Sequence, residues 1–110
     1  MHRRGAIMAT AAFIDLQGTL GGDSHGDIRS LEFYPYVADA IKRLNDIGIL
    51  VIGITNQSRI AYGDLTLADY ENKLQLLKDK LLQNDAYFDA VYCCPYNRIE
   101  NCICKNLKLE

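Results

Sequence analysis

Apolar residues gather in three short runs, and the two longer segments between the runs carry apolar residues at helical spacing. The runs are residues 11–16, 49–55 and 88–93. The second run, Ile-Leu-Val-Ile-Gly-Ile-Thr, is uncharged and rich in β-branched residues, which favour strands. Short continuous apolar runs are typical of strands that are buried in a parallel sheet. The pattern therefore predicts three strands, the first of which suits a buried position in a parallel sheet.

The two intervening segments have the spacing and the end signals of helices. In the first segment, Pro35 stands near the expected start, Gly48 suits the residue that follows a helix, and the apolar positions between them are Val37, Ile41 and Leu44. In the second segment, Thr66 and Asp69 resemble a capping box. One face of this second helix is predicted to carry Leu67, Tyr70, Leu74, Leu77 and Leu81.

The order strand, helix, strand, helix, strand predicts an α/β fold, in which an open parallel sheet has flanking helices and crossover connections. Segments 21–30 and 56–63 show no periodicity and are predicted to be loops. The loops that follow the first two strands would open at the carboxyl edge of the sheet, where ligands bind in folds of this class. A sheet of three strands also has open edges, which invite self-association.

Length and composition narrow the classes of function. A chain of 110 residues predicts one domain over residues 1–110, with residues 1–8 as a flexible lead-in. A net charge of -2 and a pI near 5.6 argue against a nucleic-acid-binding surface. No apolar run reaches the roughly 18 to 20 residues that a membrane span needs. No signal-peptide pattern follows the basic N-terminus, so we expect a cytoplasmic protein without a membrane partner.

Polar side chains end the first two predicted strands. Asp15 closes the first run just before a Gly-Thr turn, and Thr55 and Asn56 close the second. A carboxylate in this position can hold a metal or attack a phosphoryl group, while a hydroxyl and an amide can donate hydrogen bonds to phosphate oxygens. The alternatives are that Asp15 is a turn or capping residue and that Thr55 bonds only to its own loop. His25, in the first loop, is either a solvated residue or a substrate contact.

Two sequence motifs resemble those of a known superfamily. Phe-Ile-Asp-Leu-Gln-Gly-Thr over residues 13–19 and Ile-Thr-Asn-Gln-Ser over residues 54–58 resemble the first two motifs of the haloacid dehalogenase-like hydrolases. The closer resemblance is to the branch of heptose bisphosphate and histidinol phosphate phosphatases. It rests on Ile-Ala-Tyr-Gly at 60–63, Cys-Pro-Tyr at 94–96 and Cys-Ile-Cys at 102–104.

The resemblance implies a Rossmann-like core and a phosphatase that acts on a small phosphorylated metabolite, such as a sugar phosphate. Asp15 would be the nucleophile that forms an aspartyl phosphate. Asp15 and the backbone carbonyl of Gln17 would bind Mg²⁺, and Thr55 and Asn56 would hold the phosphoryl group. Lys105 would lie near the basic third motif of the family, with a solvated tail lysine as the alternative.

Two departures from the family pattern bear on activity. Gln17 stands where the family has its general acid, and an amide cannot supply the proton that is worth about 10²–10⁴-fold in rate. The chain also ends at Glu110, before the strand from which the family takes further metal-binding acids, so we expect a C-terminally shortened core or a fragment. The alternative function is a crippled or non-catalytic relative that binds phosphorylated ligands or a protein partner.

The cysteines lie together near the C-terminus, where the family has a zinc loop. Cys94, Cys102 and Cys104 match three of its ligands, but Tyr96 replaces the histidine that would complete a tetrahedron. Cys93 is the substitute ligand within the chain, yet we expect it to face the other side of its strand as a small apolar residue. Zinc in the loop over residues 94–105 is therefore doubtful, and reduced thiols are the alternative.

Overall fold

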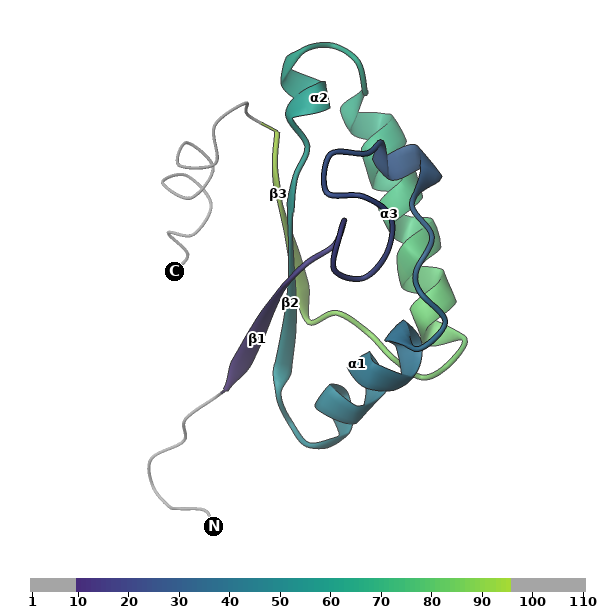
Figure 1. Cartoon of the computed structure of the whole chain (residues 1–110). Coiled ribbons are helices and arrows are strands. Elements are labelled where there is room, and N and C mark those ends of the chain that lie inside the picture. The colour runs from purple at the N-terminus through teal and green to yellow at the C-terminus, as the bar shows by residue number, and fades with distance from the viewer. Residues whose placement is uncertain (1–9, 96–110) are drawn as a thin grey trace.

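The computed structural model describes residues 10–95, so the predicted lead-in and most of the cysteine loop lie outside the described residues. Three parallel strands pair in the order β1-β2-β3, and they are β1 (Ala11–Asp15), β2 (Leu50–Asn56) and β3 (Ala90–Cys94). Helix α1 (Val37–Asp46) lies between β1 and β2 in the chain, and α3 (Leu67–Leu82) lies between β2 and β3 (Figure 1). This arrangement confirms the predicted α/β fold.

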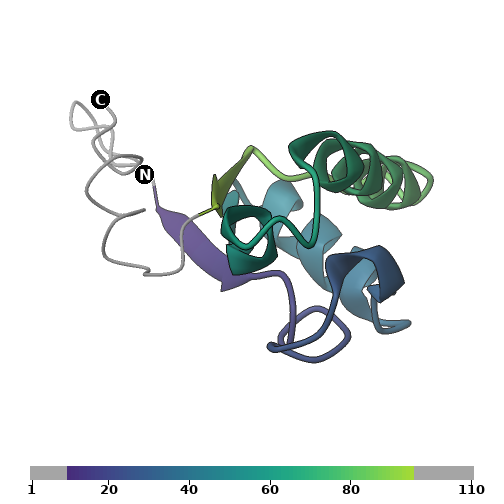
Figure 2. The same ribbon diagram turned by 90° about the horizontal axis from the view of Figure 1, so that it is seen from above.

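Both long helices cover the same side of the sheet (Figures 1 and 2). The core between the two layers includes the fully buried Leu16, Ile28, Val37, Ile41, Val51, Leu77 and Leu81. No helix covers the opposite face within the described residues, and Phe13 of β1 is 62% exposed there. The prediction of a buried first strand is therefore wrong for β1. Its residues are exposed or half-buried because it is an edge strand with one covered face.

The ends of the two helices follow the predicted signals. The Thr66 hydroxyl accepts a hydrogen bond of 3.0 Å from the backbone N–H of Asp69 at the start of α3. This bond satisfies one of the free N–H groups in the first helical turn. Gly48, which follows α1, has a φ of 84°, a left-handed conformation that favours glycine.

The buried face of α3 differs from the prediction in its first turn. Tyr70, Leu77 and Leu81 are buried, but Leu67 is 53% exposed. Leu65, just before the cap, is buried in its place and belongs to the same core cluster as Tyr70. Apolar residues at these two positions form the hydrophobic staple that fixes how a chain enters a helix. Leu65 therefore supplies the contact that periodicity assigned to Leu67.

Two short turns lie in segments that were predicted to be loops. A 3-10 helix, η1 (Ile28–Ser30), is capped by Asp27 and buries Ile28 completely. A single α-helical turn, α2 (Ser58–Ala61), follows β2 directly. Elements this short carry no periodic pattern, so periodicity does not reveal them. The α2 turn lies at the carboxyl end of β2, whereas η1 packs against α3 (Figure 1).

The third strand begins at Ala90, two positions later than predicted, because Asp89 is held at the start of the middle strand. Its carboxylate accepts a hydrogen bond of 2.7 Å from the backbone N–H of Val51, and its own N–H donates to the Val51 carbonyl at 2.8 Å. β1 and β3 are the edges of the sheet, and self-association through an open edge stays a prediction. Within residues 10–95, no helix is both long and apolar enough to cross a membrane.

Candidate active site at the carboxyl edge of the sheet

A cavity of about 190 Å³ opens where β1 and β2 end. Both strands and the first loop contribute to its lining, which consists of Asp15, Leu16, Gln17, Ser24, Ile54, Thr55 and Asn56. The structure therefore brings together the four residues that the sequence placed in one site from two distant segments. Parallel pairing of Asp15 with Ile54 accounts for this, because it sets the ends of the two strands side by side.

Asp15 is the exposed carboxylate of this cavity. No described residue makes a hydrogen bond or an ion pair with its side chain. Gly18 follows with a φ of 87°, and its N–H donates to the Gly21 carbonyl at 2.8 Å, so the chain turns back sharply after the strand. Gly21 is packed so closely that a Cβ atom would overlap the backbone oxygen of Glu32. The two glycines thus fold the loop and leave the carboxylate open to a ligand.

Thr55 is nearly buried at the end of β2, with 3% of its surface exposed. Its hydroxyl oxygen accepts a hydrogen bond of 2.7 Å from the side-chain amide of Gln57. Since the oxygen accepts this bond, the hydroxyl proton is left to donate elsewhere. Thr55 lines the cavity that holds Asp15, so a phosphate oxygen there is a suitable acceptor.

Gln17 and Gln57 form a clamp, a name that we use for the hydrogen bonds of their side chains to each other, to Gly26 and to Thr55. The Gln57 amide nitrogen donates to the Gln17 side-chain oxygen at 2.7 Å. The Gln17 amide nitrogen donates in turn to the backbone oxygen of Gly26 at 2.8 Å. Gln57 is only 2% exposed, so both of its N–H groups are satisfied inside the protein, one by Gln17 and one by Thr55. The clamp joins the loop after β1, the segment before η1 and the end of β2.

The sequence did not predict the clamp. The sequence predicts a role for the Gln17 backbone carbonyl but none for its side chain beyond a departure from the family pattern, and it places Gln57 only within a motif. The one available signal was that two glutamines follow the polar ends of neighbouring strands. A hydrogen-bonded primary amide neither releases nor takes up a proton near neutral pH, so Gln17 holds the loops together and offers no acid or base.

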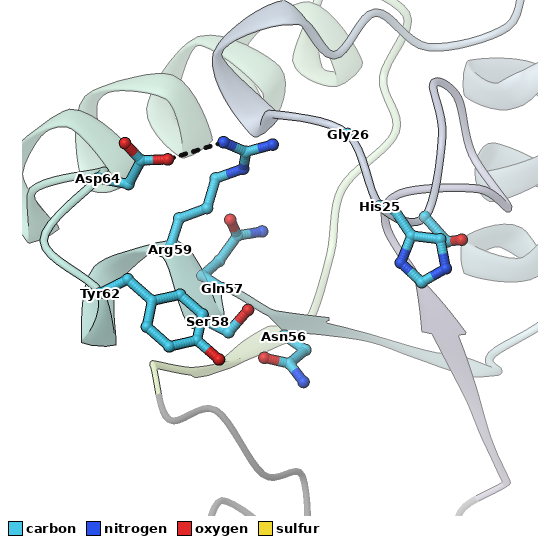
Figure 3. A pocket seen from close by; sticks show the side chains of 9 residues that line it. His25, Gly26, Asn56, Gln57, Ser58, Arg59, Tyr62 and Asp64 are labelled. Carbon is cyan, nitrogen blue, oxygen red and sulfur yellow. Dashed lines mark hydrogen bonds and ion pairs between the residues drawn. The ribbon is translucent and has the colours of Figure 1, made fainter.

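A second cavity has a volume of about 410 Å³ (Figure 3). It adjoins the first, because Ser24 and Asn56 line both. Arg59 of α2 reaches its wall and forms an ion pair of 2.9 Å with Asp64. His25, whose role the sequence left open, also lines this second cavity. The other lining residues are Gly26, Gln57, Ser58 and Tyr62. The lining is largely polar and carries both charge signs.

An ion pair fixes the loop beneath the second cavity. Arg29 and the Asp27 carboxylate lie 2.7 Å apart, and Arg29 also donates to the backbone oxygen of Asp64 at 3.1 Å. Hydrogen bonds from the Arg29 side chain and backbone lower the pKa of the Asp27 carboxyl to about 2. These contacts join the loop that follows β1 to the segment before α3, so the two walls of the cavity are held together.

The donor set around Asp15 suits a hard cation such as Mg²⁺. Mg²⁺ prefers carboxylate and carbonyl oxygens and usually keeps several waters. Asp15 offers an exposed carboxylate that no described residue pairs with, and the Gln17 backbone follows two residues later. Residues 10–95 contain no cluster of three or more His, Cys, Asp or Glu side chains. Water would therefore have to complete the coordination of a metal held by these residues, which makes weak binding the expectation.

The two described cysteines face opposite sides of the sheet. Cys93 pairs with Thr55 and packs against the core on the helix side, as predicted for a small apolar residue. Cys94 pairs with Asn56, so its side chain points to the other face, and it is buried. Neighbouring side chains on opposite faces are poorly placed to share one metal ion. The other expected residues of this region, Tyr96, Cys102, Cys104 and Lys105, lie outside the described residues, so zinc binding stays a prediction.

Comparison with known proteins finds relatives that are named as sugar phosphate phosphatases. No family model matches the chain. In sequence it is 36% identical over 90 residues to the D-glycero-beta-D-manno-heptose-1,7-bisphosphate 7-phosphatase of Escherichia coli K12. It is 31% identical over 101 residues to the enzyme of the same name from Helicobacter pylori. These matches cover 79% and 89% of this chain but 47% and 58% of the relatives, so the chain spans about half of their length.

Solved structures give the same result. A D,D-heptose 1,7-bisphosphate phosphatase from B. bronchiseptica, complexed with magnesium and phosphate, matches with a TM-score of 0.76 and 26% identity. That match covers 87% of this chain and 55% of the other. A HAD-like phosphatase from Mesorhizobium loti matches with a TM-score of 0.73 and 27% identity, covering 88% of this chain and 47% of the other.

Proposed function

Because the chain shares the motifs and the fold of the haloacid dehalogenase-like phosphatases, in the heptose bisphosphate branch, we propose that it transfers the phosphoryl group of a small phosphorylated metabolite. A sugar phosphate is the substrate class that the relatives favour. The observation that carries the proposal is the placement of Asp15. Its unpaired carboxylate shares a cavity with Thr55 and Asn56, the two residues that can donate hydrogen bonds to phosphate oxygens.

The reaction would begin with a carboxylate oxygen of Asp15 attacking the phosphorus atom in line with the leaving group. The Thr55 hydroxyl, held from behind by Gln57, would donate to a phosphoryl oxygen, and the Asn56 amide would donate to another. Mg²⁺, when bound to the Asp15 carboxylate and the Gln17 carbonyl, would neutralise charge on the phosphoryl oxygens. The product of this step is an aspartyl phosphate and a free leaving group.

The second cavity would receive the leaving group. Its volume of about 410 Å³ lies within the range of small-molecule sites. Serine, asparagine, histidine and tyrosine side chains on its wall suit the hydroxyl groups of a sugar. Arg59 offers a cation to a second anionic group on the substrate, at the cost of competition with its partner Asp64. A polar polyhydroxylated leaving group therefore fits this cavity better than an apolar one.

The clamp favours a second candidate function, in which the site binds phosphorylated ligands without turnover. Gln17 is held by hydrogen bonds to Gln57 and Gly26, so it is a fixed part of the structure and no proton donor. A natural alkyl phosphate has a leaving oxygen that needs a proton, and such substrates would react slowly or not at all. An activated aryl phosphate has a leaving group that needs no proton, so it separates the two functions.

The test is the Mg²⁺-dependent hydrolysis of an aryl phosphate by the wild-type chain and by Asp15→Asn. Asp15→Asn keeps the size of the side chain and removes the nucleophilic carboxylate, so the rate should fall to the level without protein. Asp79→Asn, which alters an exposed residue on α3, is the matched control and should keep the wild-type rate. An unchanged rate in Asp15→Asn would show that Asp15 is not the nucleophile.

A further inference from the structure

The position of Gln17 affects the two halves of the proposed reaction differently. In the first half, the bond between phosphorus and the leaving oxygen breaks, and that oxygen takes the electron pair and needs a proton unless it is a stable anion. In the second half, water attacks the phosphorus, and the bond to Asp15 breaks with its electron pair returning to the carboxylate. The carboxylate needs no proton, but the attacking water must lose one to a base. An acid–base residue serves both halves in turn.

Gln17 can serve neither half, and no other described residue that lines the Asp15 cavity replaces it. Among the described residues that line this cavity, Asp15 is the only one with a titratable side chain, and it is the group that carries the phosphoryl. The clamp keeps the Gln17 amide in place, because its oxygen accepts from Gln57 and its nitrogen donates to Gly26. The first half therefore remains open to donors with good leaving groups, while no described residue of the cavity supplies a base for the second half.

We propose, building on the phosphoryl-transfer function above, that the site is a phosphoryl acceptor. Its aspartyl phosphate at Asp15 forms faster than it is hydrolysed, so the phosphorylated chain accumulates. The donors that load it are aryl and acyl phosphates, whose leaving groups depart as anions without a proton. Glutamine at position 17, which supplies no base, thus turns a site that would release inorganic phosphate into one that stores a phosphoryl group. Loss of the base slows hydrolysis of the acyl phosphate by the acid–base factor of about 10²–10⁴.

The experiment uses the full chain with Mg²⁺ and p-nitrophenyl phosphate. Intact-protein mass spectrometry after rapid quenching should show most chains carrying one phosphoryl group, which hydroxylamine removes as it does from acyl phosphates. Release of nitrophenolate should show a burst equal to the protein concentration, followed by a slow steady phase. Acetyl phosphate should load the same fraction of chains. Asp15→Asn should show neither the added mass nor the burst.

Variants at position 17 separate loss of the base from loss of the clamp. Gln17→Asp supplies a carboxylate, so the phosphorylated fraction should fall and the steady rate should rise by about 10²–10⁴-fold. Gln17→Leu removes the hydrogen bonds without adding a base, so loading should slow, but the aspartyl phosphate, once formed, should decay no faster than in the wild type. Gln17→Glu keeps the length of the native side chain, and it should behave like Gln17→Asp if the shorter variant fails to fold.

Two results would overturn the proposal without touching the proposed function. One is steady turnover of the aryl phosphate by the wild type with no burst and no phosphorylated chain. The other is a phosphorylated chain that decays rapidly in the wild type and slowly in His25→Asn, which would make His25, from the neighbouring cavity, the missing base. Absence of both nitrophenolate and added mass in the wild type would instead refute the proposed phosphoryl transfer itself.

Discussion

Replacement of Gln57 by methionine tests whether the clamp stabilises the site. Methionine matches glutamine in length but cannot donate a hydrogen bond, so the variant removes the bonds to Gln17 and Thr55 with little change in volume. Each net hydrogen bond contributes about 0.5–1.5 kcal/mol, so the free energy of unfolding should fall by about 1–3 kcal/mol. With urea m-values of about 1–3 kcal/mol/M, the unfolding midpoint should fall by about 1 M.

The same variant should weaken the interaction with phosphate, because Gln57 no longer directs the Thr55 hydroxyl. A hydrogen bond to a charged group contributes about 1.5–3 kcal/mol, which corresponds to a factor of about 10 to 100 in rate. The quantity to compare is the rate constant of the aryl phosphate burst divided by the substrate concentration that gives half of the maximal rate. We expect this ratio to fall by that factor in the variant. Gln75→Met is the matched control. Gln75 is an exposed residue of α3 with one hydrogen bond, to Asp79, and its loss should change stability by less than about 0.5 kcal/mol. Equal stability of the two variants would refute the role of the clamp.

Four further predictions concern the site and its surroundings. Gln17→Asp should raise the hydrolysis of alkyl phosphates by about 10²–10⁴-fold, and no rise would mean that the side chain at position 17 is not what limits the chemistry. Sugar phosphates can be tested as competitors of the aryl phosphate, and Arg59→Gln should raise the half-saturating concentration of a sugar bisphosphate more than that of the matching monophosphate. Equal effects on the two competitors would rule out a second anion contact at Arg59. Asp27→Asn should lose stability at neutral pH. The folded pKa of Asp27 lies below its usual 3.8, so the stability difference from wild type should vanish as the pH falls from 3.8 to about 2 in acid unfolding titrations. Elemental analysis should find substoichiometric zinc and Tyr96→His should raise it, whereas one tightly held zinc per wild-type chain would show that another residue completes the tetrahedron.

Periodicity and strand ends were enough to predict a parallel sheet of three strands whose first two polar ends meet at its carboxyl edge. The three apolar runs became the three strands, and the polar ends of the first two runs line one cavity. The exposure of Phe13 was not predictable, because an apolar run does not show which face of its strand a helix will cover. The exposure of Leu67 was not predictable from helical spacing. Leu65, which lies before the cap of α3, packs into the core where the spacing placed Leu67.

The hydrogen bonds of the site depend on loop geometry that no sequence pattern encodes. The bond from Gln17 to Gly26 requires the turn that Gly18 makes after the first strand, and the bond from Gln57 joins residues that are distant in the chain. The family resemblance identified Gln17 as a departure from the general acid. Only the fold assigns that side chain a structural role, because its hydrogen-bond partners come from other segments of the chain.

Identification of the phosphorylated residue tests the central claim, that the carboxylate at the end of β1 accepts the phosphoryl group. Borohydride reduces an acyl phosphate to an alcohol, so an aspartyl phosphate becomes homoserine, which tandem mass spectrometry of peptides can locate. After incubation with Mg²⁺ and an aryl phosphate, we predict homoserine at position 15 and no homoserine in a sample without the phosphate. Homoserine in place of a different aspartate would contradict the account. So would phosphorylated protein that yields no homoserine and an unmodified Asp15.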